Sequence, residues 1–298
     1  MMNSGQSDRE MARRSFVIMA SLGISVAGMA GMAVSAADGI PADAKPVEGW
    51  AVDGTEARSQ ENRLYIRFTK PLDPDSKLVL PRLVGVVQSV RWLEGKADGM
   101  SLQPEPQEWV IRLAEAPAGV EPILLLTLDG PVRLFRPGAV VAAADGQVFL
   151  RACEAAVYGR NLRYEPQPHK NTVGYWSVAE DYADWHCEVP ADGMYEVDIL
   201  QGCGAGHGGS AVEVRVQDQP LSLKVVETGH FQNFIWKSLG VVTLKKSGDS
   251  LVSVRCLKKQ GGAVMDVRAI RLVPAGRTRS QEPQLAAPEQ LPEALRGR

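Results

Sequence analysis

The sequence predicts an all-β protein made of two β-sandwich domains. Residues 47–147 and residues 148–274 both consist of short segments in which apolar and polar residues alternate, separated by turns rich in Pro, Gly and Asp. The mature chain has no segment of useful length with the 3.6-residue period of a helix, which excludes folds that alternate strands with helices. The full sequence has 33 basic and 35 acidic residues and no cluster of basic residues, so nucleic acid is not an expected partner.

The first 36 residues have the pattern of an export signal. Arg13 and Arg14 precede an apolar stretch rich in Gly and Ala, which ends in the small residues VSAADG. The sequence RRSFVI resembles a twin-arginine signal, and a general secretory signal that happens to contain two arginines is the alternative. Because the apolar stretch is short and interrupted by glycines, we expect no membrane span after cleavage. The mature protein is therefore expected in the periplasm or outside the cell.

The first domain, residues 47–147, shows four clear strand patterns. The segments LYIRF (64–68) and EWVIRL (108–113) alternate, KLVLP (77–81) ends at a proline, and ILLLTL (123–128) is largely apolar, as in a buried strand. The sequences LDPDS and LDGP supply turns between them.

The second domain, residues 148–274, repeats this pattern. The segments MYEVDIL, AVEVRV, LSLKVV, LGVVTL and LVSVRC alternate or nearly alternate, and such regular spacing is typical of a sandwich. Residues 275–298 mix Pro, Gln and charged residues with little to bury, which favours disorder, and a short docking helix is the alternative.

Part of the first domain resembles a known family. The stretch from NRLYIRFTKPLDPDSKLVLP to EPILLLTLDGPV resembles the C-terminal β-domain of bacterial family 29 α-L-fucosidases. In that family the domain follows a catalytic barrel, which this sequence does not contain, so the resemblance implies no fucosidase activity. A retaining glycosidase needs two carboxyl groups about 5 Å apart across the sugar, and no catalytic motif of that barrel is available here.

The second domain resembles the galactose-binding-like, jelly-roll carbohydrate-binding modules of family 6 type that are appended to bacterial fucosidases and sulfatases. The matching sequences are CEAAVYG, NTVGYWSVAEDYADWHCEVPADGMYEVDI, GCGAGHGGSAVEVRV, ETGHFQNFIWKSLGVVTL and AVMDVRAIRLVP, in the expected order and spacing. The resemblance implies a sugar site at one end of the sandwich.

The resemblance also names the residues of that site. In these modules aromatic rings contact the apolar C–H face of a pyranose, and amides and acids bind its hydroxyls. Matching positions assign the aromatic role to Tyr175 or Trp176 and to Phe231. Amide contacts fall to Gln232 and Asn233, and an acidic contact to Glu180 or Asp181. An Asn of the family pattern is replaced by Val264, and packing of the aromatic rings at the sandwich edge is the alternative interpretation.

Two further features concern metals and thiols. The resemblance implies a candidate structural calcium site at Glu154 and Asp266, although Ala156 replaces one carboxylate of the family pattern. The four cysteines, all in the second domain, allow two disulfides in three pairings or free thiols. A zinc site at His186, Cys187, Cys203 and His207 lacks the usual ligand spacing.

These observations predict an exported, non-catalytic carbohydrate-binding accessory protein whose partner is a polysaccharide or other glycan. The alternative is a β-sandwich module that docks a separately encoded secreted glycoside hydrolase or sulfatase. An enzyme on a β-sandwich, such as a lyase, would need a clustered base and cation, and the sequence shows no such cluster.

Overall fold

The computed structural model describes residues 39–72, 76–94 and 99–279. The expected export signal and the part of the tail after residue 279 lie outside these residues. Within them, no helix is long and apolar enough to cross a membrane. The described chain is all-β apart from one 3-10 turn, η1 (Ala152–Glu154), which confirms the predicted fold class.

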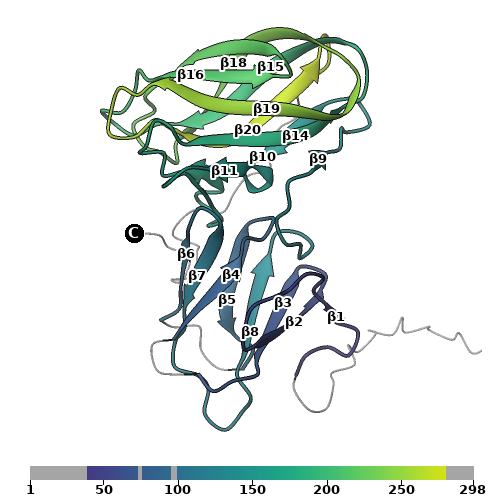
Figure 1. The fold of residues 1–298 in the computed structure, drawn as a ribbon, viewed down its shortest axis with the longest axis vertical. Helices are drawn as coiled ribbons and strands as arrows, with labels where there is room; N and C mark the ends of the chain where they lie inside the picture. The colour runs from purple at the N-terminus through teal and green to yellow at the C-terminus, as the bar shows by residue number, and fades with distance from the viewer. Residues whose placement is uncertain (1–38, 73–75, 95–98, 280–298) are drawn as a thin grey trace, which may run out of the picture.

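The first sandwich packs a sheet of order β1-β2-β3-β8-β5 against a smaller sheet of order β4-β7-β6 (Figure 1). All pairs in these two sheets are antiparallel. Its strands are β1 (Lys45–Pro46), β2 (Thr55–Gln60), β3 (Arg63–Phe68), β4 (Lys77–Pro81), β5 (Val87–Trp92), β6 (Ser101–Pro104), β7 (Glu108–Arg112) and β8 (Ile123–Leu128). The apolar β8 lies between two neighbours and is almost entirely buried, as its sequence predicts.

The second sandwich has one sheet of order β12-β13-β20-β15-β18, to which β10 adds by pairing with β20. Its other sheet has the order β11-β14-β19-β16-β17, and β9 pairs in parallel with β14. The strands are β9 (Ala139–Val140), β10 (Val148–Arg151), β11 (Ala156–Tyr158), β12 (Arg163–Glu165), β13 (Thr172–Gly174), β14 (Tyr182–Val189), β15 (Gly193–Gly202), β16 (Ala211–Val216), β17 (Gln219–Lys224), β18 (Phe234–Leu244), β19 (Ser247–Lys258) and β20 (Asp266–Pro274).

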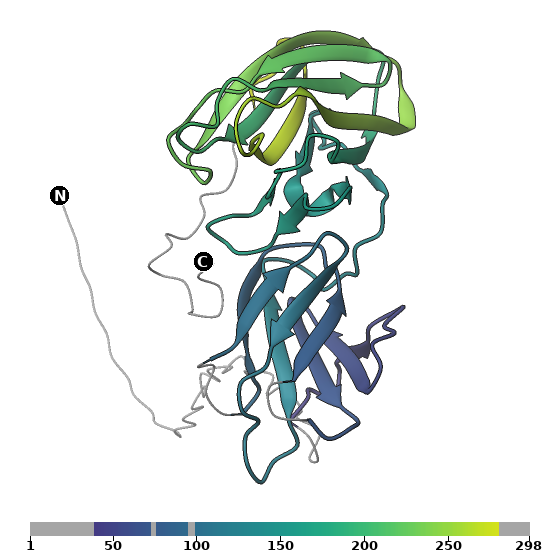
Figure 2. The same cartoon turned by 60° about the vertical axis from the view of Figure 1, so that its left-hand side comes forward.

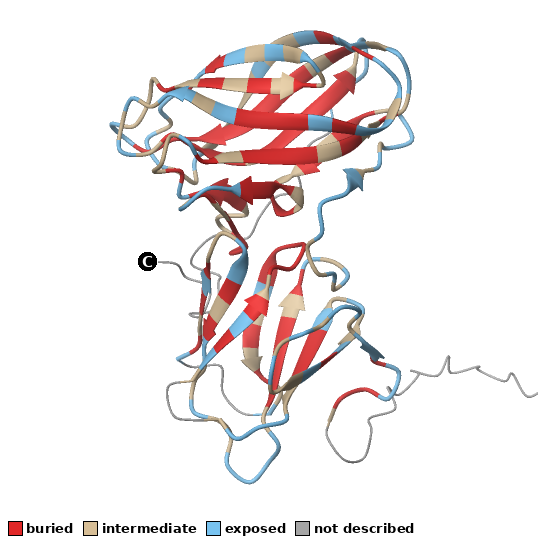
Figure 3. Ribbon diagram, in the orientation of Figure 1, coloured by how far each residue is buried: buried red, intermediate tan, exposed pale blue. Residues whose placement is uncertain are grey.

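Alternation in the sequence explains which side chains enter the second core. In β14 every second residue from Ala183 to Val189 is buried, and Trp185 is fully enclosed. The buried residues, red in Figure 3, fill the space between the sheets and continue into the region where the two sandwiches meet.

Arg82 of the first domain ties the two sandwiches together. Its side chain is 4 % exposed, and its guanidinium donates hydrogen bonds to the carbonyl oxygens of Ala155 at 2.7 Å and Cys153 at 2.9 Å. The same guanidinium lies over the rings of Phe135 and Tyr164. These carbonyls belong to the end of η1, which has no further helical turn to bond them. Burial lowers the pKa of Arg82 to about 10, so the group stays charged at neutral pH.

Other contacts close the same junction. The Tyr164 hydroxyl donates to the carbonyl of Gly85 at 3.0 Å, and the Val87 N–H donates to the carbonyl of Pro166 at 2.9 Å. Seen from the side in Figure 2, the segment that follows β10 lies between the two sandwiches. The two domains therefore share a built interface of hydrogen bonds and ring contacts.

We expect Arg82→Met to lower the free energy of unfolding by roughly 3 kcal/mol or more, because it leaves buried carbonyls without a donor. Arg58→Met is the matched control, since the exposed Arg58 donates to one carbonyl, that of Ala44. Urea denaturation followed by tryptophan fluorescence measures both. Equal, small losses in the two variants would contradict the role given to Arg82.

Candidate functional site

In the β12-β13-β20-β15-β18 sheet of the second domain, the strand ends at one edge of the sandwich lie side by side in a row. Register places Arg163 beside Gly174, and Gly202 between Asp266 and Phe234. The loops that follow or precede these residues therefore lie at one end of the sandwich. These loops contain the aromatic and amide residues that the sequence singled out.

Tyr175 is the exposed aromatic residue of this end. The residue directly follows β13 and is 54 % exposed. Its φ of 59° lies in the left-handed region, which is uncommon and strained for a residue with a side chain. The Arg163 guanidinium carbon lies 3.9 Å from the centre of the Tyr175 ring, so a cation covers one ring face. The residue stays exposed despite this contact.

Trp176 lies on the other side of the backbone. It is 1 % exposed, and its carbonyl accepts a hydrogen bond from the N–H of Val264 at 2.8 Å. Of the two aromatic residues that the sequence offered at this position, the structure therefore places Tyr175 outside and Trp176 in the core. Val264 is fully buried, which accounts for an apolar residue at that position.

Asp181 ends the loop that carries Tyr175 and ties it to the turn at residues 159–162. It is 1 % exposed, and its carboxylate accepts hydrogen bonds of 2.9 Å from the backbone N–H groups of Arg160, Asn161 and Leu162. A Cβ at Gly159 would lie 1.9 Å from one carboxylate oxygen, so the loop can close over Asp181 only with glycine there. The acidic contact expected from this residue is thus directed to the protein backbone, whereas Glu180 is exposed.

Further bonds fix the same loop. The side-chain amide of Asn161 donates to the Ser177 hydroxyl at 2.8 Å, and the Lys259 ammonium donates to the Ser177 carbonyl at 2.5 Å. With Trp176 anchored in the core, the backbone on both sides of Tyr175 is held. The exposed ring is therefore preorganised, which lowers the entropy that a ligand must overcome.

Phe231 packs mainly on its own loop cluster. Its ring centre lies 5.3 Å from that of His207, and the ring lies so close to Gly204 that a Cβ there would be 2.6 Å away. The His207 ring accepts the Ala263 N–H at 3.0 Å through Nδ1, which joins a third loop to the cluster. Phe231 is half-buried, and its carbonyl packs on Gly202 at the end of β15. Because β20 lies between β15 and β13, Gly202 is two strand spacings, about 10 Å, from the end of β13.

The two amide residues have different surroundings. Gln232 points between the strand ends, where its amide donates to Asp266 at 3.4 Å. Asn233 donates to the carbonyl of Thr228 at 2.7 Å and so closes its own loop. The structure therefore brings Gln232 and Asp266 together, and it shows Asn233 as a loop-closing residue at the rim.

Asp266 is a buried carboxyl group at the centre of the row. It is 3 % exposed, and its oxygens lie so close to Gly174 that a Cβ there would be 2.8 Å from one of them. Burial raises the pKa of Asp266 well above its usual range, and the negative charge of Glu165 adds to the shift.

The two residues predicted for calcium, Glu154 and Asp266, have protein partners in the structure. Glu154 accepts hydrogen bonds from the N–H and the guanidinium of Arg151, so both of its oxygens are engaged. Ca²⁺ takes six to eight oxygen ligands, and no group of three metal-capable side chains occurs in the described part of the chain. We therefore assign no step to a bound cation.

The four cysteines are free thiols in this structure. Burial raises the pKa of Cys153 and of Cys203 to about 11 and that of Cys187 to about 12, so these thiols are poor nucleophiles. His186 is bonded instead to Asp249, with 2.7 Å between Nδ1 and a carboxylate oxygen. The described residues therefore give the zinc alternative no support.

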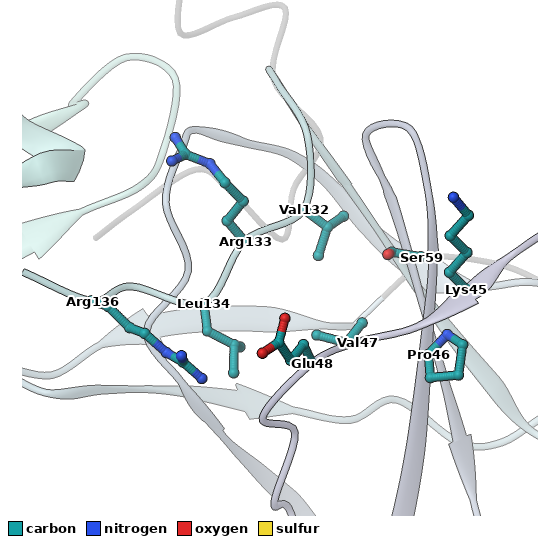
Figure 4. Close-up of a pocket in the computed structure, with 9 residues that line it drawn as sticks. All are labelled: Lys45, Pro46, Val47, Glu48, Ser59, Val132, Arg133, Leu134 and Arg136. Atoms are coloured by element: carbon teal, nitrogen blue, oxygen red, sulfur yellow. The ribbon is translucent and has the colours of Figure 1, made fainter. Parts of the chain in front are cut away.

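The clefts found in the first domain and the connector lie apart from the predicted site residues at the strand ends. The cleft in Figure 4 has a volume of about 340 Å³, and a neighbouring one of about 380 Å³ shares Arg133 and Arg136 with it. Both are wide open. The first is lined by Lys45, Pro46, Val47, Glu48, Ser59, Val132, Arg133, Leu134 and Arg136.

Sequence reasoning missed Arg163 and the structural role of Asp181. The segment NLRYE gives no local sign that its arginine lies against Tyr175, because that contact depends on the pairing of β12 with β13. Asp181 precedes an alternating strand, and its backbone bonds reach about twenty residues back along the chain. Neither contact has a short-range sequence pattern.

Fold and site together define a two-domain β-sandwich protein. At the strand ends of its second domain the exposed ring of Tyr175, on a loop held by hydrogen bonds, forms an aromatic platform. No protein-family model and no curated protein sequence matches the chain. Solved structures similar to it include a family 35 carbohydrate-binding module from Clostridium thermocellum, with 18 % identity and a TM-score of 0.35, over 43 % of this chain and 98 % of that one. A second is the C-terminal family 6 module of a laminarinase from Zobellia galactanivorans, with 17 % identity, a TM-score of 0.36 and the same coverage.

A third similar structure is an α-L-fucosidase from Vibrio sp. strain EJY3, with 14 % identity and a TM-score of 0.32. The match includes 74 % of this chain and 39 % of the fucosidase, so the chain spans well under half of that enzyme's length. Because all three scores are below 0.5, the functional conclusion below rests on the residues of this chain.

We expect Asp181→Asn to lower the free energy of unfolding by roughly 2–4 kcal/mol, because the amide cannot accept all three buried N–H groups. Glu180→Gln, at the exposed neighbour, is the control and should change it by less than about 0.5 kcal/mol. Chemical denaturation gives both values. If Asp181→Asn unfolds like the wild type, the carboxylate does not hold this loop.

The Asp266 carboxyl predicts a pH effect with a definite sign. Since its pKa is raised in the folded state, the folded protein retains this proton after the unfolded chain has lost it. The contribution of Asp266 to the free energy of unfolding therefore falls as pH rises from about 4, the pKa of an unfolded Asp, through the raised folded pKa. Asp266→Asn should remove this part of the pH dependence, as measured by urea denaturation between about pH 4 and 8. Asp218→Asn, at an exposed site, should keep it, and equal pH profiles for Asp266→Asn and the wild type would refute the assignment.

Proposed function

We propose that this protein is a non-catalytic carbohydrate-binding protein that acts outside the cytoplasm. The observation that supports this most is the exposed ring of Tyr175, held rigidly at the strand ends with Arg163 on one face. A pyranose presents a patch of C–H groups that packs on such a ring. Gln232, whose side chain reaches Asp266 on the strand next to β13, offers its amide oxygen to the sugar hydroxyls.

The site has features that suit an extended glycan. Tyr175 is 54 % exposed and lies in a loop at the sandwich end, a position that a long polysaccharide chain can reach. The ring is already fixed by the buried Trp176 and by Asp181, so little ordering is needed on binding. Binding at such open sites gains from the C–H contact and a few hydroxyl hydrogen bonds.

The carboxyl groups near the platform favour binding over hydrolysis. A glycosidase needs two carboxyl groups on either side of the scissile bond, one of them protonated. Asp181 is buried and accepts three backbone N–H groups, and Asp266 is buried beside Gly174. Both groups are buried, and a third nearby carboxylate, that of Glu105, is already engaged by Gln103 and Arg163. A role as accessory to a secreted glycoside hydrolase or sulfatase agrees with this and with the signal pattern at Arg13 and Arg14.

The test is a glycan array followed by calorimetry with the full mature chain. We expect at least one saccharide to bind, and Tyr175→Ala to weaken its binding at least about tenfold, which corresponds to about 1.4 kcal/mol. Tyr158→Ala is the matched control, because Tyr158 is 39 % exposed on the other sheet of the same sandwich.

Two results would contradict this function. One is a wild-type chain that is folded by its melting curve and binds no saccharide on the array, which would leave docking of a protein partner as the function to test by pull-down. The other is equal affinity of the wild type and Tyr175→Ala. Release of sugar from a polysaccharide by the purified chain would contradict the non-catalytic assignment.

A further inference from the structure

The turn between β6 and β7 of the first domain lies against the second domain beside Tyr175. The side-chain amide of Gln107, in this turn, donates to the carbonyl of Val157 at 2.9 Å. Below the turn, the ring of Trp109 packs against that of Tyr164, with 6.4 Å between their centres. The turn is thus attached to β11 and β12, the strands that lead to Arg163.

Glu105 occupies a defined position in this turn. Its N–H donates to the carbonyl of Glu108 at 2.8 Å, which closes the turn, and its carboxylate accepts the side-chain amide of Gln103 at 2.9 Å. The other carboxylate oxygen lies 3.8 Å from Nη1 of Arg163. Glu105 therefore reaches from one domain to a cation of the other.

Arg163 depends on this contact. Its side chain is 14 % exposed, and Glu105 supplies the one ion pair that Arg163 makes among the described residues. Its Nε is buried without a hydrogen-bond partner in that part of the chain. A cation that is so little hydrated is costly unless an anion lies close to it. The same guanidinium lies over the face of the Tyr175 ring.

We propose that the first domain is a working part of the saccharide site, in which Glu105 is a positioning residue that holds Arg163 against one face of Tyr175. The inference rests on the proposed function. The ion pair and the ring contact form one chain, from Glu105 through Arg163 to Tyr175. Fixing the guanidinium on one face keeps the ring at a constant angle and leaves the opposite face for the sugar.

The charges of this chain also indicate the class of ligand. Glu105 and Arg163 offset each other's charge next to the ring, so this pair adds no net charge there. A neutral pyranoside meets neither attraction nor repulsion there, whereas a sulfated or uronic saccharide gains no free cation from Arg163. Neutral polysaccharides are therefore the ligands that this platform fits.

The experiment uses the full mature chain with Glu105→Ala, Glu105→Gln and Glu105→Asp. The probes are laminarin, hydroxyethyl cellulose, mannan and dextran as neutral polysaccharides and fucoidan as an anionic one, all in affinity electrophoresis. The position of the Arg163 side chain is followed separately by its Hε–Nε NMR signal, which the ring current of Tyr175 displaces and which Tyr175→Phe and Tyr175→Ala help to assign.

We expect Glu105→Ala and Glu105→Gln to move the Arg163 signal toward its position in Tyr175→Ala and to weaken binding of a neutral polysaccharide about threefold to tenfold. Glu105→Asp, which keeps the charge, should displace the Arg163 signal less and weaken binding less than Glu105→Ala does. Glu121→Ala is the control, because it removes an ion pair with Arg67 elsewhere in the first domain and should change neither readout.

An Arg163 signal that is unchanged in Glu105→Ala overturns the positioning role, whatever the binding result. A displaced signal with unchanged affinity overturns its importance for binding. Preferential binding of fucoidan by the wild type overturns the ligand class. A wild type that binds none of the probes contradicts the proposed function itself, and the NMR arm still shows whether the three side chains are connected.

Discussion

The buried guanidinium of Arg82 is the contact on which the arrangement of the two sandwiches depends. It comes from the first domain and donates to carbonyl groups at the end of the 3-10 turn that opens the second domain. Because the group is charged and almost without solvent, each of these hydrogen bonds is worth more than a neutral one at the surface. The rings of Phe135 and Tyr164 complete its surroundings. The junction between the two domains therefore combines directional hydrogen bonds with apolar ring contacts.

A specific junction has a consequence for the strand-end site. It brings the β6–β7 turn of the first domain to the strands that support Tyr175, so that residues far apart in the sequence lie in contact. The platform is then fixed from two sides, by Trp176 and the Asp181 loop within the second domain and by Glu105 from the first. A protein that binds extended polymers gains from such rigidity, because a shallow contact must not lose free energy to ordering.

The sequence was sufficient for the fold class, whereas the position of the sugar site stays a prediction. Alternating segments identify strands, since side chains of a strand point to opposite faces in turn, and both sandwiches follow this rule. It was insufficient for the choice between Tyr175 and Trp176, because the left-handed φ of Tyr175 departs from simple alternation. It also could not show that Asp181 bonds backbone rather than ligand, or that Asp266 is buried, since both depend on long-range packing. Nor could it show that Arg151 engages the carboxylate of Glu154, one of the two residues predicted for calcium.

The most direct test of the central claim is a crystal structure of the full mature chain with the saccharide that it binds most tightly. The account predicts a pyranose ring stacked on the face of Tyr175 opposite to Arg163, with a hydroxyl within hydrogen-bonding distance of the Gln232 amide. A saccharide bound elsewhere, for example over the stacked rings of Tyr158 and Tyr182 on the other sheet, would contradict it.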